Sequence, residues 1–199
     1  GSPALKAWKY PLPGDKQVAM LYRVVINVEE GGVVRLQVPP DPHRSTLGDN
    51  ITATGGVLAD IEWNPDGSEF AFVSTSRDHK SAKLRIADAV SGAVREVFEE
   101  KVATQFESGH GAINWRYLPA SQEIIWFSER DNWGHLYLYD ARTGQLKNQI
   151  TKGDYLAARV LDVDEKNRQI TFAGMGKDPV NPYYTHVYRI GFDGGGLLP

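Results

Sequence analysis

The 199-residue sequence predicts an all-β fold: an incomplete β-propeller with about three blades of four antiparallel strands each, plus part of another blade. Three features predict it. Similar segments recur about every 52 residues, each period contains short alternating strands, and turn-forming residues separate the strands. A β-sandwich also has regularly spaced strands, but it lacks self-similarity at a fixed offset. The repeat therefore favours the propeller.

The repeat is clearest in two strands that end in aspartate and lead into a glycine turn. Residues 83–88 (KLRIAD) and 135–140 (HLYLYD) alternate in the same way and begin 52 positions apart. Trp63 and Trp115 have the same separation, which suggests that the two tryptophans are equivalent. A weaker third copy, residues 186–190 (HVYRI), follows the second by 51 positions and also runs into a glycine-rich turn. These offsets define blades without reference to any known protein.

Each period is expected to contain four short strands, and no helix is expected beyond single turns in loops. The expected strands of the first period are residues 58–63, 70–74, 83–88 and 94–98. Those of the second are 112–115, 123–127, 135–140 and 146–151, and those of the third are 159–163, 169–173 and 185–190. Residues 18–28 and 33–38 are expected to close an earlier blade. Turns such as Asn64-Pro65-Asp66-Gly67 separate the strands, because proline fixes φ and glycine accepts positive φ.

The composition excludes several classes of function. The net charge is −3 and the 22 lysines and arginines are scattered, so no basic surface for nucleic acid is expected. There are no cysteines, which excludes thiol catalysis and cysteine-ligated zinc. No apolar run approaches the roughly 20 residues that a membrane-spanning helix needs. No histidine pair has metal-ligand spacing, and no cofactor is expected.

Residues 1–3 (GSP) are small and polar, and they are expected to be the remnant of a cleaved tag. Residues 4–199 are then the partial propeller. Because each blade buries its faces against its neighbours, an isolated arc exposes apolar blade faces. We therefore expect homo-oligomers that form through these faces.

One segment resembles a known family. Residues 126–140 (WFSERDNWGHLYLYD) resemble a propeller motif of the dipeptidyl peptidase IV branch of the prolyl oligopeptidase family of serine peptidases. Shorter stretches agree with the same family: Tyr10-Pro11 with Gly14, residues 63–67, and Asn181-Pro182 before residues 186–189. The resemblance runs over nearly the whole chain from about residue 6.

The resemblance implies a non-catalytic domain of a larger enzyme. In the family, the propeller is followed by an α/β-hydrolase domain whose serine, aspartate and histidine release dipeptides from peptide N-termini. The propeller caps that active site and admits short or unstructured peptides. The resemblance thus implies peptide substrates and a C-terminal hydrolase domain as partners, an inactive segment on its own, and a periplasmic or secreted location. The alternative is a stand-alone protein-interaction propeller of the WD-repeat or translocation-protein type.

No residue of this chain is predicted to be catalytic. The sequence has no G-x-S-x-G match, the strained turn that presents a nucleophilic serine in hydrolases. In the relatives, the loop before the second period reaches toward the substrate cleft, which makes Phe106, Glu107 and His110 cleft candidates. The competing interpretation of this loop is a solvent-exposed connector between blades.

The family-like motif is predicted to be structural. Arg130 is expected to bind a carboxylate, and the similar Ser76-Arg77-Asp78 turn favours a repeated structural element. His135 is expected to hydrogen-bond the turn before it, through Glu129 or Asp131. Trp63 and Trp115, together with these motif residues, complete the predicted structural set.

Overall fold

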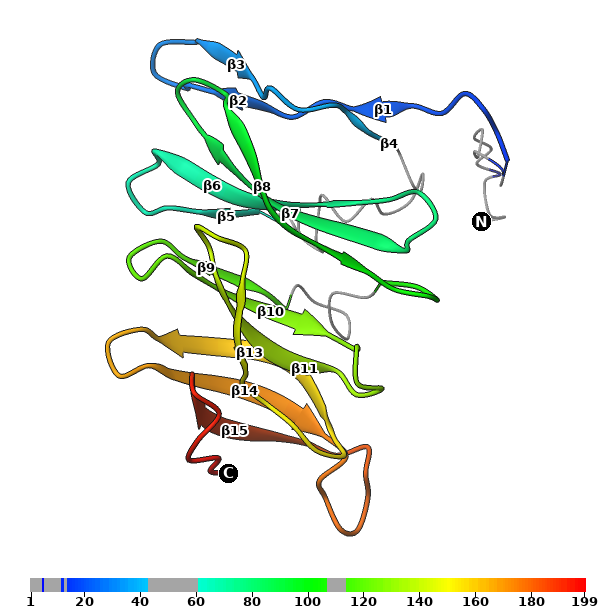
Figure 1. Cartoon of the computed structure of the whole chain (residues 1–199), viewed down its shortest axis with the longest axis vertical. Helices are drawn as coiled ribbons and strands as arrows, with labels where there is room; N and C mark the ends of the chain where they lie inside the picture. The colour runs from blue at the N-terminus through cyan, green and yellow to red at the C-terminus, as the bar shows by residue number, and fades with distance from the viewer. Residues whose placement is uncertain (1–4, 6–11, 13, 43–60, 107–113) are drawn as a thin grey trace.

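The computed structural model shows a stack of small antiparallel sheets (Figure 1) and describes residues 5, 12, 14–42, 61–106 and 114–199. Blade 1 contains β1 (Met20–Leu21), β2 (Val24–Ile26), β3 (Val33–Arg35) and β4 (Asp41–Pro42); blade 2 contains β5 (Ile61–Trp63), β6 (Glu69–Thr75), β7 (Ser81–Asp88) and β8 (Val94–Lys101). Blade 3 contains β9 (Arg116–Leu118), β10 (Glu123–Ser128), β11 (His135–Asp140) and β12 (Leu146–Gln149); blade 4 contains β13 (Leu156–Asp164), β14 (Gln169–Met175) and β15 (Thr185–Gly191).

Blades 2 and 3 are four-stranded meanders in which each strand pairs with the next along the chain. Blade 4 has three strands in the same order, whereas blade 1 consists of the two-stranded pairs β1–β4 and β2–β3. All pairs are antiparallel, and the described residues form no helix. The all-β prediction with four-stranded blades is therefore confirmed. No helix in the described part is long and apolar enough to cross a membrane.

The strand sequences explain their positions in each sheet. Every residue of β10 is buried, because β10 is a middle strand and both of its faces are covered by neighbouring blades. The fourth strand β8 is mostly charged and half of its residues are exposed, which protects an open sheet edge from pairing with other chains. The predicted turn before β6 is confirmed: Gly67 has φ of +73° and its amide bonds the Asn64 carbonyl at 2.9 Å.

Some predicted strand boundaries differ from the structure. The first described strand of blade 3 lies at residues 116–118, where its backbone pairs with residues 123–125 of β10. Asn114 and Trp115, the described part of the predicted range 112–115, precede this strand. Asn114 instead turns its side chain to the next blade, where it bonds the Ala157 carbonyl at 2.9 Å and the Val160 amide at 2.6 Å. The expected strand at 18–28 is interrupted, and β4 was not anticipated.

The predicted equivalence of Trp63 and Trp115 is wrong. Glu69, the first residue of β6, pairs with Asp88 at the end of β7, and Glu123, the first residue of β10, pairs with Asp140 at the end of β11. Glu69 and Glu123 are therefore equivalent positions. Trp63 lies opposite Phe70, the second residue of β6, and Tyr117 lies opposite Ile124, the second residue of β10. Trp63 is therefore equivalent to Tyr117, and Trp115 precedes β9. The 52-residue spacing of the tryptophans therefore does not mark equivalent positions, because the equivalent residues of β5 and β9 are 54 positions apart.

Three apolar clusters lie between successive blades and form the core. The cluster between blades 1 and 2 contains Leu36, Phe70, Phe72 and Ala87. The cluster between blades 2 and 3 is rich in aromatic residues and includes Trp115, Trp126, Tyr137 and Tyr139. The cluster between blades 3 and 4 includes Phe127, Leu136, Tyr155, Phe172 and Phe192. Each blade thus depends on its neighbours for burial, as expected of a repeat architecture.

A glycine in one hairpin turn of each later blade touches the preceding blade. Gly92, Gly144 and Gly194 all have positive φ, near +74°, +72° and +83°. A Cβ at Gly144 would collide with the Val97 carbonyl oxygen of β8, and a Cβ at the other two would crowd carbonyl oxygens of the blade before them. The glycines therefore serve two purposes, because they form the turn and allow two backbones to approach closely.

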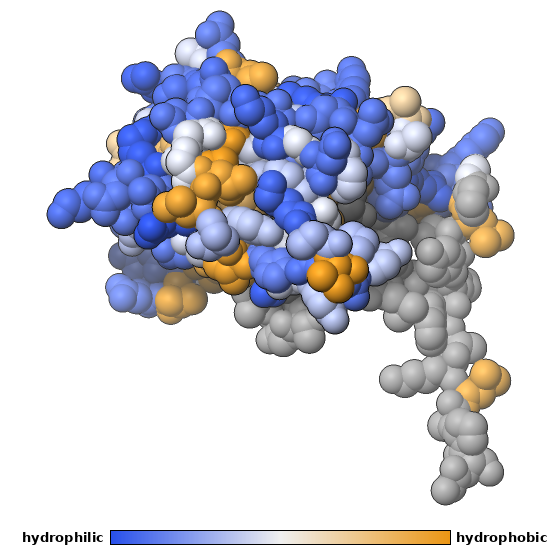
Figure 2. Space-filling model, turned by 90° about the horizontal axis from the view of Figure 1, so that it is seen from below, coloured by the Kyte–Doolittle hydropathy of each residue, from blue (hydrophilic) through white to orange (hydrophobic). Residues whose placement is uncertain are grey.

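The end of the stack that carries blade 4 has a mixed surface. Figure 2 looks onto this end and shows hydrophobic residues in separate patches among hydrophilic ones. Val187 and Leu198 are about half exposed there, next to the exposed Arg159 and Arg189. At the other end, β2 and β3 expose Val24, Ile26 and Val33 along one sheet face.

Candidate functional site

The family-like motif forms the hairpin turn between β10 and β11. Ser128 and His135 are the last paired residues, and the Asn132 amide bonds the Glu129 carbonyl at 3.1 Å. Asn132 has φ of +70°, a conformation that asparagine tolerates better than most residues. The local sequence therefore closes a tight turn that projects Arg130 toward blade 2.

Blade 2 has the same turn between β6 and β7. The His79 amide bonds the Ser76 carbonyl at 3.0 Å, and His79 has φ of +59° at the position that Asn132 occupies in blade 3. Arg77 reaches back along the stack, and its guanidinium bonds the carbonyls of Asp15 and Leu12, both at 2.7 Å. The predicted repeated turn is thus present. In both blades, the arginine of the turn contacts residues that come before its own blade in the sequence.

Arg130 is the centre of a polar network between blades 2 and 3. Its Nη2 binds Glu100 of β8 at 2.9 Å and the Tyr139 hydroxyl at 2.8 Å, and its Nε donates to Ser128 at 2.9 Å. Glu100 also accepts from the Trp126 indole at 2.6 Å and from Ser128 at 2.5 Å, and it is only 9% exposed. The predicted carboxylate partner of Arg130 therefore exists, and it comes from the preceding blade.

The charges of this network are fixed by their surroundings. Burial by itself would lower the pKa of Arg130, but its bonds to Tyr139 and Glu100 outweigh burial and raise the pKa. Burial raises the pKa of Tyr139, and burial together with the Asp131 carboxylate raises the pKa of Tyr137 to about 12. The Arg130 guanidinium lies 4.3 Å from the Tyr137 ring centroid. The Arg130 guanidinium is therefore paired with the buried Glu100 side chain between two tyrosines with raised pKa values, and the pair joins blades 2 and 3.

His135 does not bind the turn before it, in contrast to the prediction. Its Nδ1 lies 3.0 Å from the Thr151 hydroxyl and its Nε2 lies 2.9 Å from the Gly153 carbonyl. The β11 alternation turns the ring toward blade 4, so its partners come from the connection that leads to β13. Thr151 and His135 form a hydroxyl–imidazole pair, and both side chains are fully buried.

Of the three cleft candidates, only Phe106 lies within the described residues; Glu107 and His110 lie outside them. Phe106 is buried, and its ring stacks on Trp126 at 5.6 Å between centroids. Its amide bonds the His79 carbonyl at 2.5 Å. Phe106 thus anchors the connection between blades 2 and 3 in the aromatic cluster.

The remaining motif residues are spread over the molecule. Trp63 is 45% exposed and rests on Phe70, with ring centroids 4.4 Å apart. Trp115 is buried beside Trp126. Asp131 accepts from the Gln149 amide of β12 at 2.8 Å. Glu129 contributes its carbonyl to the turn described above. The structure therefore brings Trp115 and Arg130 to one interface but leaves Trp63 on another.

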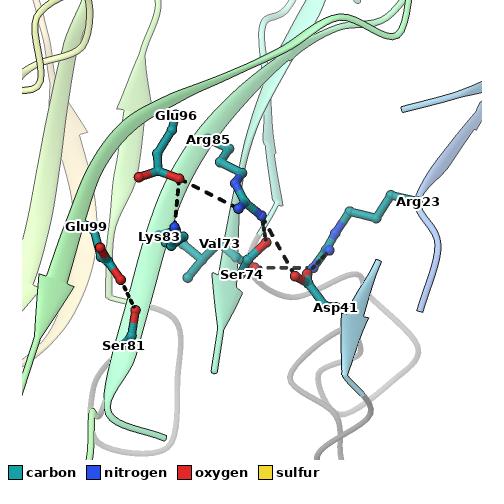
Figure 3. A network of polar contacts seen from close by, with 9 residues as sticks. All are labelled: Arg23, Asp41, Val73, Ser74, Ser81, Lys83, Arg85, Glu96 and Glu99. Atoms are coloured by element: carbon teal, nitrogen blue, oxygen red, sulfur yellow. Dashed lines mark hydrogen bonds and ion pairs between the residues drawn. The ribbon is translucent and has the colours of Figure 1, made fainter. Parts of the chain in front are cut away.

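A second polar network lies between blades 1 and 2 and was not foreseen from the sequence (Figure 3). Asp41 of β4 is held by Arg23 and lies 3.8 Å from Arg85 of β7. Arg85 also donates to Ser74 at 2.8 Å and lies 3.7 Å from Glu96 of β8. A signal was present in β7, where basic residues alternate with buried apolar ones, so one face of this strand is charged and points to blade 1.

Glu123 is a buried carboxylate that joins blades 3 and 4. It is 2% exposed, and Arg168 binds it with a two-pronged fork at 2.9 and 3.1 Å. Lys147 of β12 completes the site at 2.5 Å. Burial alone would raise the pKa of Glu123, but the bonds from Arg168 and Lys147 lower it to about 2. The carboxylate therefore stays charged across the neutral range.

Arg116 links the first strands of three blades. Its guanidinium lies 4.0 Å from Glu62 of β5 and donates to the Val160 carbonyl of β13 at 3.1 Å. Burial raises the pKa of Glu62, and Arg116 opposes that shift. None of these networks has the nucleophile–base geometry of a hydrolase, and the described residues contain no cluster of three or more metal-ligating side chains.

Comparison with known proteins decides the family. The sequence matches the family described as the dipeptidyl peptidase IV (DPP IV) N-terminal region over residues 1–197. This chain belongs to that family. As a DPP IV N-terminal region, it also resembles solved structures of peptidases. The dipeptidyl peptidase 4 of Porphyromonas gingivalis aligns with a TM-score of 0.67 at 18% identity, over 96% of this chain and 24% of that one.

Two further solved structures share the fold. A dipeptidyl aminopeptidase IV homologue from Bacteroides ovatus aligns with a TM-score of 0.59 at 21% identity, over 92% of this chain and 30% of that one. TolB from Acinetobacter baumannii aligns with a TM-score of 0.53 at 14% identity, over 86% of this chain and 35% of that one. This DPP IV N-terminal region therefore spans less than a third of the two peptidases. Both the predicted resemblance and the partial propeller are confirmed.

Proposed function

We propose that this chain is the accessory, substrate-gating propeller segment of a serine exopeptidase that releases N-terminal dipeptides. The observation that carries the proposal is the family match over residues 1–197, together with polar sites that clamp blades and offer no catalytic geometry. In this proposal hydrolysis takes place in a separate α/β-hydrolase domain of a longer protein, and the peptide substrate passes the propeller before it reaches that domain.

The arrangement of turns supports a gate at one rim. Figure 1 shows the turns that follow β6, β10 and β14 on the same side of the stack. Phe106, the residue from which the next connection starts, lies beside the turn that follows β6, because its amide bonds the His79 carbonyl. Its ring stacks on Trp126 of β10. We assign the substrate-facing role to this connection, through Glu107 and His110. Glu100, which Arg130 binds, also accepts a hydrogen bond from the Trp126 indole on which the Phe106 ring stacks.

The gate is tested in the longer protein by comparing substrates of different length. Arg130→Met loosens the clamp between blades 2 and 3, and Glu107→Gln and His110→Ala alter the proposed cleft residues. We expect kcat/KM for a long peptide to change several-fold relative to kcat/KM for a dipeptide chromogen. Arg77→Met is the matched control, because its turn has the same geometry but contacts other chain. Equal changes for both substrates would contradict gating.

A second candidate function is a stand-alone protein-interaction propeller. The similarity to TolB from Acinetobacter baumannii favours it, since that likeness covers 86% of this chain. The two candidates differ in what the longer protein does. A dipeptide chromogen that stays intact with the purified longer protein, together with stable capture of a partner protein, supports the interaction propeller.

A further inference from the structure

The strand β2 has an open edge. The Leu36 amide bonds the Arg23 carbonyl at 3.1 Å and the Asn27 amide bonds the Gly32 carbonyl at 2.8 Å, so these residues direct their backbone groups toward β3. In an antiparallel pair such residues alternate with others whose N–H and C=O groups point the opposite way. Val24 and Ile26 are those others, and no described strand pairs with their edge.

The internal repeat identifies what this edge lacks. The Gly144 turn of blade 3 touches β8, the fourth strand of blade 2, and the Gly194 turn of blade 4 touches the end of the fourth strand of blade 3. The Gly92 turn of blade 2 touches Arg35 of β3 in the same way. Strand β3 is therefore the fourth strand of its blade and β2 is part of the third. The first two strands have no counterpart among the described residues of blade 1.

An aromatic residue of blade 2 is exposed where the first two strands of blade 1 would cover it. Trp63 is 45% exposed, whereas its equivalent in blade 3, Tyr117, is 4% exposed. Tyr117 is covered by blade 2, where Glu69 accepts its hydroxyl hydrogen bond. Blade 1 offers no described strand over β5, so the Trp63 ring keeps one face in solvent. A large apolar side chain left open at an otherwise buried repeat position indicates a missing contact.

The open edge and the exposed ring lie on the same side of the stack. The β3 side of the hairpin lies over the outer strands of blade 2, because Gly92 meets Arg35 between β7 and β8. The β2 side lies over β6, where the Arg23 guanidinium is 4.7 Å from the Phe72 ring centroid. The free edge of β2 therefore points toward β5, the strand that carries Trp63.

We propose that a two-stranded antiparallel segment docks here. One of its strands pairs with the edge at Val24 and Ile26, and its apolar side chains cover Trp63. We assign this segment to the polypeptide that precedes β1 in a longer protein, because strands follow chain order in blades 2 and 3 and the aligned peptidases are more than three times as long as this chain. In blade 2 the corresponding strands and turns take residues 61–80. This proposal rests on contacts within the chain and not on peptidase activity.

The test uses Trp63 as a reporter of coverage. Acrylamide quenching of tryptophan fluorescence is measured for this chain and for the longer protein, each as wild type and as Trp63→Phe, and the difference isolates the Trp63 emission. We expect its quenching constant to fall at least fivefold in the longer protein. The Trp133→Phe difference is the control, because Trp133 is 40% exposed in the turn after β10 and should stay equally quenchable. An unchanged Trp63 quenching constant would overturn the proposal.

Hydrogen exchange provides an independent test that needs no substitution. We expect the amides of Val24 and Ile26 to exchange at least tenfold more slowly in the longer protein than in this chain, while the Val25 amide, which faces β3, changes little. Slow exchange of Val24 and Ile26 already in this chain, together with a dimer in light scattering, would show that a second copy fills the edge. That result would overturn the assignment to preceding chain.

Discussion

Blades 2 and 3 have the same strand order and the same two kinds of turn, yet their first strands differ in burial. Trp63 of β5 is 45% exposed, while the equivalent Tyr117 of β9 is 4% exposed. The sequences of the two strands do not explain this, because each offers a large aromatic residue at the same register position. The neighbour explains it: β9 is covered by blade 2, and β5 has no described strand over it. Burial in this fold is therefore set by the adjacent blade.

The largest expected effect contrasts the two equivalent aromatic residues. Tyr117→Ala removes a buried ring and a hydrogen bond to Glu69, and it should lower the free energy of unfolding by about 3–5 kcal/mol. Trp63→Ala removes a ring that is already half in solvent and should cost about 1 kcal/mol. Urea denaturation of both variants measures the two costs. Equal costs would contradict the difference in coverage.

The next effect tests the close approach of blades 2 and 3. Gly144→Ala places a methyl group against the Val97 carbonyl at a positive φ, and it should cost about 2–4 kcal/mol. Gly67→Ala is the matched control, since Gly67 has nearly the same φ but no atom within 4 Å of the added Cβ. The control should cost about 1–2 kcal/mol. Thermal unfolding measures the stability of both variants. If Gly67→Ala lowered the stability as much as Gly144→Ala, the contact with Val97 would not explain the cost.

Acid should weaken the joint between blades 3 and 4 through Glu123. The folded pKa of about 2 lies below the ordinary carboxyl value of 4.5, so this stabilisation is complete above pH 5 and is lost as the pH falls toward 2. The loss is on the order of 2–3 kcal/mol. Glu123→Gln should flatten this part of the pH–stability curve, as measured by urea unfolding at each pH. An equally steep curve in the variant would assign the acid sensitivity to other carboxyl groups.

The smallest effect separates the two arginines of the repeated turn. Arg130→Met removes bonds to Glu100, which is buried, and should cost about 1.5 kcal/mol. Arg77→Met removes bonds from an exposed guanidinium to two carbonyls and should cost less, about 0.5 kcal/mol. Differential scanning calorimetry of both variants gives the comparison. If Arg77→Met cost more than Arg130→Met, the buried partner of Arg130 in the preceding blade would not determine the cost.

Local patterns made the strands and turns predictable. Strand β11 has the predicted bounds, because its alternation and the aspartate–glycine turn after it are encoded in neighbouring residues. The Asn64–Gly67 turn was predictable for the same reason. The repeat offset also identified equivalent hairpins. The equivalence of Trp63 and Trp115 failed because β6 and β7 pair over one residue more than β10 and β11, so the first strands are offset by 54 residues and not by 52.

Contacts between blades were not predictable from the sequence. Nothing near Arg130 indicates that its partner is Glu100, which lies in another blade and 30 residues away. His135 was expected to bind its own turn, but the alternation of β11 sends the ring to Thr151 and Gly153. Phe106 is followed by small polar residues that suggest a loop, yet its ring is buried against Trp126. Partners of this kind depend on how whole blades stack.

The most direct test of the account asks whether this chain has peptidase activity of its own. Release of the chromophore from a Gly-Pro or Ala-Pro chromogen is measured with the purified chain and with the longer protein at equal molar concentration. The account predicts no release above buffer from the chain and turnover by the longer protein, because the proposed hydrolase domain lies outside these residues. Turnover by the chain alone that a serine-directed inhibitor abolishes would contradict it.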